Sequence, residues 1–333
     1  MSDLKERDPF FDALKGLAII AVLFIHTPYT TVSEYPNIPY FIRHMFTFAV
    51  NTFFFCSGYF CKLGTGADWQ RFRRLLAPYV IWTLPFVTYA FYNRSYSFTA
   101  GKILSIIFCG GGFGILYFLS VLMQLALLRG LLSAAITMKK RCLDCIIFMI
   151  TPLYILIVDV LFMGVKQFQY HWVFPAWVSF YYFGMMMRNR ELRIRFSAVT
   201  LFGLLIVALF LSIAETAFWL RRGILQLAVT QVSFSSFFYS AVIILLLVKG
   251  RNTVTNGESV LCRIGTMSFG IFLMHIPMMK LISYIMVKAK INALPYGIST
   301  LLEIGLVLLI CIIVIRFALR LIPLKYARLI GLV

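Results

Sequence analysis

Long runs of apolar residues, each close to the length of a membrane-spanning helix, dominate this chain of 333 residues. A helix needs about 20 such residues to cross a hydrocarbon core that is roughly 30 Å thick. The runs lie at roughly 10–30, 40–60, 75–92, 113–136, 143–163, 172–188, 196–214, 229–248, 264–287 and 297–322. The longest connections, 93–112 and 215–228, are too short for a separate domain. We therefore predict one domain over 1–333, an all-α integral membrane bundle of about ten transmembrane helices.

The composition agrees with a membrane protein. Of the residues, 61% are hydrophobic and 13% are charged, whereas soluble domains average about 45–50% and 25%. A net charge of +19 could indicate nucleic-acid binding, but the basic residues stand in short clusters between the apolar runs. Cytoplasmic loops of membrane proteins have this pattern. We expect membrane lipid as a partner and no nucleic acid.

The basic clusters also predict the orientation. With the N-terminus in the cytoplasm, most of the 31 Lys and Arg residues fall in inside segments. An even number of spans then places both termini in the cytoplasm. The run at 10–30 is longer than the apolar part of a signal peptide, about 7–15 residues, so we interpret it as a retained first helix.

The first predicted span carries three ionisable residues on one stripe. Asp12 and Lys15 are three residues apart, and His26 follows Lys15 by eleven residues. At 100° per residue these positions share a helical face, with Lys15 and His26 ~16 Å apart along the axis. Ionisable groups inside a membrane are costly and usually functional. Lys15 could instead be an interfacial anchor whose ammonium reaches the headgroups.

His275 and Glu303 lie in the last two predicted spans, at depths that could bring them near His26 in the outer half of the bundle. A histidine beside a carboxylate is the arrangement of a general base with an orienting partner. The alternatives stay open, because His275 could bond a neighbouring helix and Glu303 could pair with a basic residue.

Several short motifs occur in an order typical of one family. They are Phe11-Asp12-x-Leu14-Lys15-x10-His26, Phe53-Phe54-Phe55-Cys56-Ser57-Gly58-Tyr59, Arg71-Phe72-Arg73-Arg74, Tyr117-Phe118-Leu119 and Ser268-Phe269-Gly270-Ile271-Phe272-Leu273-Met274-His275. Together they resemble the acyltransferase-3 family over most of the chain. Lys15 stands where Arg is commoner in that family, and Phe272 stands where Tyr is usual.

The resemblance implies an O-acetyltransferase of the bacterial inner membrane. It implies transfer of an acetyl group from cytoplasmic acetyl-CoA to a hydroxyl of a surface polysaccharide, such as O-antigen of lipopolysaccharide, capsule or a lipid-linked glycan precursor. Arg71 and Arg74 would bind the CoA phosphates, since arginine recognises phosphate bidentately, although positive-inside topology alone would also supply them. Lys15 would contact donor phosphate or pair with Asp12.

His26 would be the general base that deprotonates the acceptor hydroxyl, with a nearby carboxylate setting its tautomer. The candidates for the remaining catalytic groups are Asp12, Glu303 and His275. A covalent acyl-histidine is an open alternative.

Two further motifs resemble cofactor-binding sites, but each lacks residues that such a site requires. Cys142 and Cys145 form a CxxC without a second pair or clustered histidines, so we expect no metal. The glycine-rich 109–114 has no lysine at Walker spacing, and we interpret it as the entry to a helix.

Two other functions remain as alternatives. A proton-coupled transporter or flippase-like protein would use His26 and Glu303 as a relay, but it predicts inverted repeats and the sequence has none. A non-catalytic partner of a glycan assembly complex would need neither base nor donor site. Protection of Arg71 and Arg74 by CoA would separate the enzyme from both.

Overall fold

The computed structural model describes residues 8–27, 38–92, 99–109, 114–161, 170–190, 194–228, 230–254, 257–291 and 294–332. Within these residues the regular structure is entirely helical. The first eight helices are α1 Pro9–His26, α2 Ile38–Met45, α3 Phe48–Tyr59, α4 Trp69–Tyr92, α5 Ala100–Cys109, α6 Tyr117–Leu127, α7 Arg129–Met138 and α8 Arg141–Leu161. The others are α9 Val178–Asn189, α10 Ala198–Arg221, α11 Leu225–Ala228, α12 Phe234–Lys249, α13 Val260–Thr266, α14 Ser268–Lys288, α15 Tyr296–Leu321 and α16 Leu324–Leu329, with 3-10 turns at Tyr170–Trp172, Phe174–Ala176 and Arg251–Thr253.

Five of the described helices are long and apolar enough to cross a membrane, namely α1, α8, α10, α14 and α15. Helices α6 and α7 together pass the same test but meet at an angle of 56°, which brings the number to six if the bent pair is one span. The all-helical membrane architecture is therefore as predicted. The count of about ten spans and the cytoplasmic termini stay predictions.

Several predicted spans differ from the helices in detail. The run at 40–60 is divided between α2 and α3, the run at 113–136 between α6 and α7, and the run at 264–287 between α13 and α14. At the first break, Thr47 Oγ donates to the carbonyl of His44 at 2.8 Å. The break lies inside an apolar run, so hydropathy alone cannot locate it.

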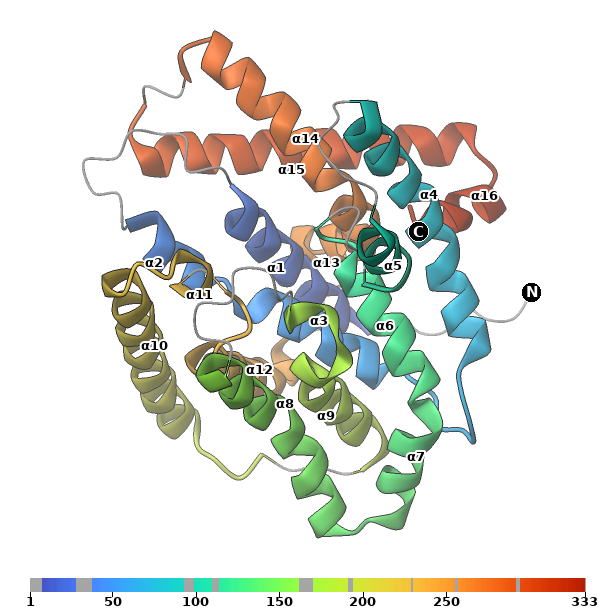
Figure 1. The fold of residues 1–333 in the computed structure, drawn as a ribbon, viewed down its shortest axis with the longest axis vertical. Helices are drawn as coiled ribbons and strands as arrows, with labels where there is room; N and C mark the ends of the chain where they lie inside the picture. Colours follow the sequence, from blue (N-terminus) through green and yellow to red (C-terminus); the bar gives the residue numbers. More distant parts are fainter. Residues whose placement is uncertain are drawn as a thin grey trace. The chain divides into compact units, whose positions relative to one another are not determined.

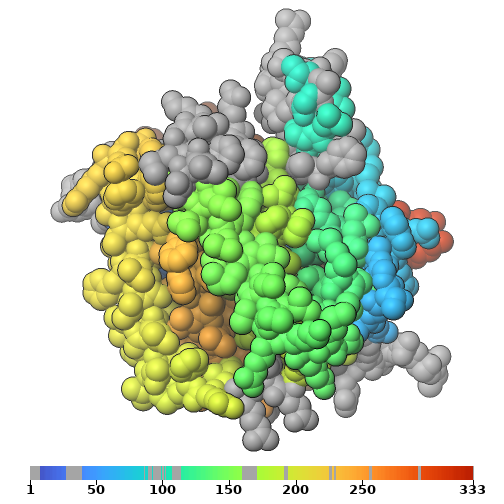
Figure 2. Space-filling model, turned by 60° about the horizontal axis from the view of Figure 1, so that its bottom comes forward, coloured from blue at the N-terminus to red at the C-terminus, as the bar shows by residue number. Residues whose placement is uncertain are grey.

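Helix α10 combines one buried stripe with a large exposed apolar surface. Its buried side chains, Leu201, Ala208, Ser212, Thr216 and Trp219, recur at helical spacing and form one stripe. The rest of the helix exposes apolar side chains; Val199, for example, is 83% exposed. Helix α10, yellow in Figure 2, packs along α12. An exposed apolar face of this extent is suited to a hydrocarbon environment.

The chain divides into two compact units. The first comprises Met1–Phe53, Arg193–Ala327 and Leu332–Val333, and the second comprises Phe54–Leu192 and Arg328–Gly331. In the first unit α1 contacts α2, α13, α14 and α15, and α14 packs on α15 (Figure 1). In the second unit α4 packs on α6, and α8 packs on α9.

Two glycines hold α1 against α13 in the first unit. A Cβ added to Gly265 would lie 1.7 Å from the carbonyl oxygen of Asp12, and one added to Gly16 would lie 2.1 Å from that of Leu261. The two backbones are therefore in direct contact, as small residues permit in membrane helix pairs. This contact fixes the end of α1 that carries Asp12 and Lys15.

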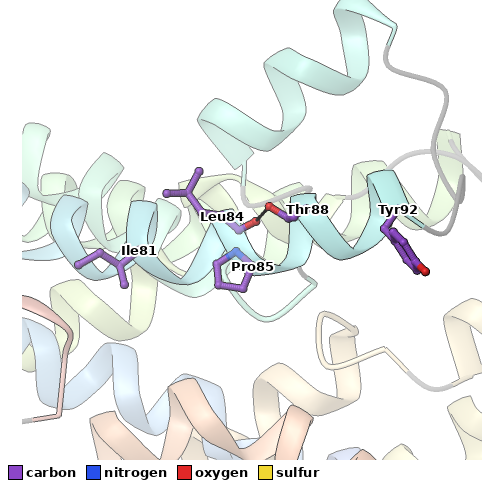
Figure 3. Close-up of a pocket in the computed structure, with 5 residues that line it drawn as sticks. All are labelled: Ile81, Leu84, Pro85, Thr88 and Tyr92. Atoms are coloured by element: carbon purple, nitrogen blue, oxygen red, sulfur yellow. Dashed lines mark hydrogen bonds between the residues drawn. The ribbon is translucent and has the colours of Figure 1, made fainter.

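A mostly apolar hollow runs along α4 in the second unit, lined by Ile81, Leu84, Pro85, Thr88 and Tyr92 (Figure 3). Pro85 has no N–H to bond the carbonyl of Ile81, while Thr88 Oγ1 donates to the carbonyl of Leu84 at 2.9 Å. The lining is apolar and exposed, with Tyr92 84% exposed. This part of α4 has the character of a lipid-facing surface, and it contains none of the predicted site residues.

Candidate functional site

The structure brings two of the predicted site residues together at the end of α1. His26 is the last residue of α1, and its ring centroid lies 5.1 Å from that of His275 in α14, with an angle of 54° between the ring planes. Thr27 closes the helix, since its backbone N–H and its hydroxyl both donate to the carbonyl of Leu23. The contact of α1 with α14 therefore creates a pair of imidazoles.

The tautomer of His275 follows from its hydrogen bond. Nδ1 lies 2.6 Å from the carbonyl oxygen of Phe272, so Nδ1 carries the proton and donates. In the neutral ring Nε2 is then an acceptor. Nε2 is buried and has no hydrogen-bond partner among the described residues. An unused acceptor in a buried ring beside His26 is suited to receive a proton or an N–H bond.

A proline follows this ring at a short distance. Pro277 lies inside α14, and its missing N–H leaves the carbonyl of Leu273 without its helical donor. The helix that carries His275 thus contains a weak point two residues further on.

Asp12 and Lys15 pair with each other at the other end of α1. Lys15 Nζ lies 2.7 Å from Asp12 Oδ1, and the side chains are 27% and 12% exposed. His26 is fourteen residues after Asp12, which is ~21 Å along a helix. Asp12 is therefore not the carboxylate that orients His26.

Glu303 has its hydrogen bond with Ser283 and, among the described residues, not with an imidazole. Its Oε1 accepts a hydrogen bond of 2.5 Å from Ser283 Oγ. Ser283 follows His275 by eight residues on α14, about 12 Å along the helix. The group beside His26 in the structure is thus a second imidazole, and the two predicted carboxylates are bound elsewhere.

The arginines expected to bind the donor lie in the first turns of α4, in the second unit. Arg71 Nη1 donates to Tyr181 Oη at 3.3 Å and Nη2 to the carbonyl of Ser57 at 3.0 Å. Its guanidinium also lies 5.6 Å from the centre of the Tyr181 ring. Arg74 is one turn further on and exposed. The two residues share a face of α4, but Arg71 is fixed by its hydrogen bonds and Arg74 is exposed.

Sequence reasoning missed one buried histidine. His44 is 1% exposed, with Nδ1 3.0 Å from Ser212 Oγ and Nε2 2.7 Å from the carbonyl of Ala228. Nε2 therefore donates, and Nδ1 accepts from the hydroxyl. Both partners are far away in the chain, so no local pattern could have shown this role. His44 ties α2 to α10 and to α11.

No cluster suited to a metal occurs among the described residues, where groups of three or more His, Cys, Asp or Glu side chains are absent. Cys142 and Cys145 lie at the start of α8, exposed and unbonded to each other.

Comparison with known proteins identifies the family. Residues 8–318 match the model of the acyltransferase-3 family, described as an acyltransferase domain. No curated protein and no solved structure matches the chain. The match covers nearly the whole chain, including the imidazole pair and the arginines of α4. The chain belongs to the acyltransferase-3 family of membrane acyltransferases.

Proposed function

We propose that this acyltransferase moves an acetyl group from cytoplasmic acetyl-CoA to a hydroxyl of a surface polysaccharide or of a lipid-linked glycan precursor, in the inner membrane of a bacterium. The observation that carries the proposal is the imidazole pair of His26 and His275, 5.1 Å apart at the end of α1. Acyl transfer to a hydroxyl needs a base that accepts its proton, and a neutral imidazole meets that need.

His26 is the base in this reaction. It takes the proton of the acceptor hydroxyl while the oxygen attacks the thioester carbonyl. The tetrahedral species then collapses, the C–S bond breaks, and the CoA sulfur leaves with the proton from His26. The products are the O-acetyl ester and CoA, and no other reactant is consumed.

His275 orients that base. Two imidazoles joined by an N–H···N bond have ring centroids about 5 Å apart, given a donor–acceptor distance of about 3 Å. The centroid separation of 5.1 Å would allow such a bond once the rings turn toward each other; in the structure His275 Nε2 has no hydrogen-bond partner among the described residues. A bond there would leave the reacting nitrogen of His26 unprotonated and would stabilise the imidazolium formed during transfer, which is the usual task of a carboxylate.

The donor phosphates bind at the first turns of α4. Arg71 has five guanidinium N–H groups and uses two nitrogens on Tyr181 and Ser57, which holds the remaining donors in place. Arg74 is exposed on the same face. Lys15, paired with Asp12, supplies a further cation at the predicted cytoplasmic end of α1.

Surface glycan from cells with and without the protein provides the test. We expect acetyl esters, read by mass and by proton resonance, in cells that make the protein and none in cells that lack it or carry His26→Ala. Acetyl-CoA should also raise the melting temperature of the purified protein. An unchanged glycan in all three strains would overturn the proposal.

A further inference from the structure

Arg129 makes three hydrogen bonds to the segment that leads into α4. It is the first residue of α7, directly after the bend between α6 and α7. Its guanidinium donates to three consecutive carbonyls of the segment before α4: Thr65 at 3.4 Å, Gly66 at 3.2 Å and Ala67 at 3.2 Å. One planar cation therefore holds the backbone of 65–67 against the start of α7.

The same segment touches α7 through glycine. A Cβ added to Gly130 would lie 2.5 Å from the backbone nitrogen of Gly66, and Gly66 itself has a φ of +77°. A side chain at Gly130 would push the segment away, and a side chain at Gly66 would be strained. The segment and the bend thus fit each other closely.

Asp68 connects the segment 65–67 and α7 to the start of α4. Its backbone N–H donates to the carbonyl of Ala126 at 2.8 Å, and its Oδ2 lies 3.7 Å from Arg129 Nη1. Its Oδ1 accepts from the backbone N–H of Arg71 at 3.0 Å, which is the bond an N-cap residue makes. The start of α4 is therefore set by Asp68, and Asp68 lies between Arg129 and Arg71.

We propose that Arg129 is a positioning residue of the donor site, which fixes the first turns of α4 and so places Arg71 and Arg74 for the phosphates of the acyl-CoA. The inference rests on the proposed donor site and adds a residue that does not touch the donor. Arg129 donates hydrogen bonds to carbonyls and forms an ion pair with Asp68 at 3.7 Å, so its effect reaches the donor through Arg71. Preorganised binding groups lose less entropy when the ligand binds.

The test measures acetyl transfer from radiolabelled acetyl-CoA by membrane vesicles containing wild-type protein, Arg129→Gln or Arg129→Lys. Without the bonds from Arg129 the first turns of α4 are less preorganised for the donor phosphates, so we expect Arg129→Gln to raise KM for acetyl-CoA about tenfold with kcat within about twofold. A change in KM alone indicates lost ground-state binding. Arg129→Lys keeps the charge but not the planar fork, so its KM should lie between the two.

Two further variants separate positioning from a purely structural role. Arg73→Gln, an exposed neighbour on another face of α4, should leave KM unchanged. Arg71→Gln should raise KM, and adding Arg129→Gln to it should raise KM little further, because residues acting through one another are not additive.

An unchanged KM in Arg129→Gln, or full additivity with Arg71→Gln, would overturn the inference. If Arg129→Gln does not fold, Arg129→Lys provides the test. A wild-type KM for acetyl-CoA in that variant would contradict the positioning role of Arg129. Wild-type KM values for both Arg71→Gln and Arg74→Gln would instead refute the donor site itself.

Discussion

The imidazole rings of His26 and His275 lie 5.1 Å apart, although they belong to the first and to one of the last membrane-spanning helices. The buried acceptor of His275 has its proton position set by Phe272. A carboxylate in this place would add a negative charge to a helix that is apolar enough to span a membrane, where an unpaired charge is costly. In the proposed mechanism a second neutral imidazole would orient the base without that charge, which suits a membrane interior.

Replacing His26 with Gln should lower kcat for acetyl transfer at least about 100-fold, because general base catalysis contributes about 10²–10⁴. KM for acetyl-CoA should stay near the wild-type value, since the arginines of α4 are untouched. His44→Gln is the matched control. It loses hydrogen bonds to Ser212 and Ala228 and should lower the melting temperature with little effect on kcat. Full activity in folded His26→Gln would contradict the assignment.

Replacing His275 with Phe should lower kcat by less than the loss in His26→Gln, with KM for acetyl-CoA unchanged. Phe fills the space of the ring but has no acceptor for a proton or an N–H bond. His275→Asn restores a side-chain acceptor and should recover part of the loss. Equal kcat values for Phe, Asn and the wild type would show that His275 only fills space.

Gly265→Leu should prevent the close contact of α1 and α13, because even a Cβ would lie 1.7 Å from the carbonyl of Asp12. Overpacking costs about 1–3 kcal/mol and sometimes more. We expect a lower melting temperature and a lower yield of folded protein in detergent. Gly203→Leu on α10, with no atom within 4 Å of the added Cβ, should behave as the wild type. Equal melting temperatures for the two variants would argue against the packing.

Asp144→Asn should be more destabilising than Tyr182→Phe. Asp144 accepts 2.6 Å hydrogen bonds from Tyr182 Oη and Arg190 Nη1, and its ion pair with Arg190 has side chains 12% and 14% exposed. Breaking a buried ion pair costs about 3–5 kcal/mol, whereas losing one hydrogen bond to a charged group costs about 1.5–3 kcal/mol. Thermal unfolding of the purified variants measures both, and the reverse order would contradict the prediction.

The exposed cysteines test the predicted orientation. Cys142 and Cys145 are exposed and belong to a segment predicted to be cytoplasmic. In a Cys109→Ser background, an impermeant maleimide should label these residues only after the cells are permeabilised. The variant Cys142→Ser with Cys145→Ser should lose that label. Labelling in intact cells would reverse the topology.

The long helices were predictable because their signal is local. Helices α1, α8, α10, α14 and α15 are predominantly apolar and near or above the length that a membrane requires. The pairing of Asp12 with Lys15 could also be predicted from the sequence, because helical spacing alone places those side chains on one face.

The remaining features depend on distant contacts. The bend between α6 and α7 lies in an apolar run, and Arg129 there bonds carbonyls more than sixty residues away. The imidazole partner of His26 and the partners of His44 likewise come from remote helices. The periodicity of a sequence indicates which residues are apolar, but it does not indicate which helices pack against each other.

Pro277 gives α14 two halves with separate tasks. The half before it holds the imidazole of His275, and the half after it holds Ser283 and its bond to Glu303. Because the proline interrupts the backbone bonding between these halves, a tilt imposed on the second half by a thicker or thinner bilayer would be absorbed most easily at Pro277. Catalytic geometry would then be insulated from changes in lipid composition.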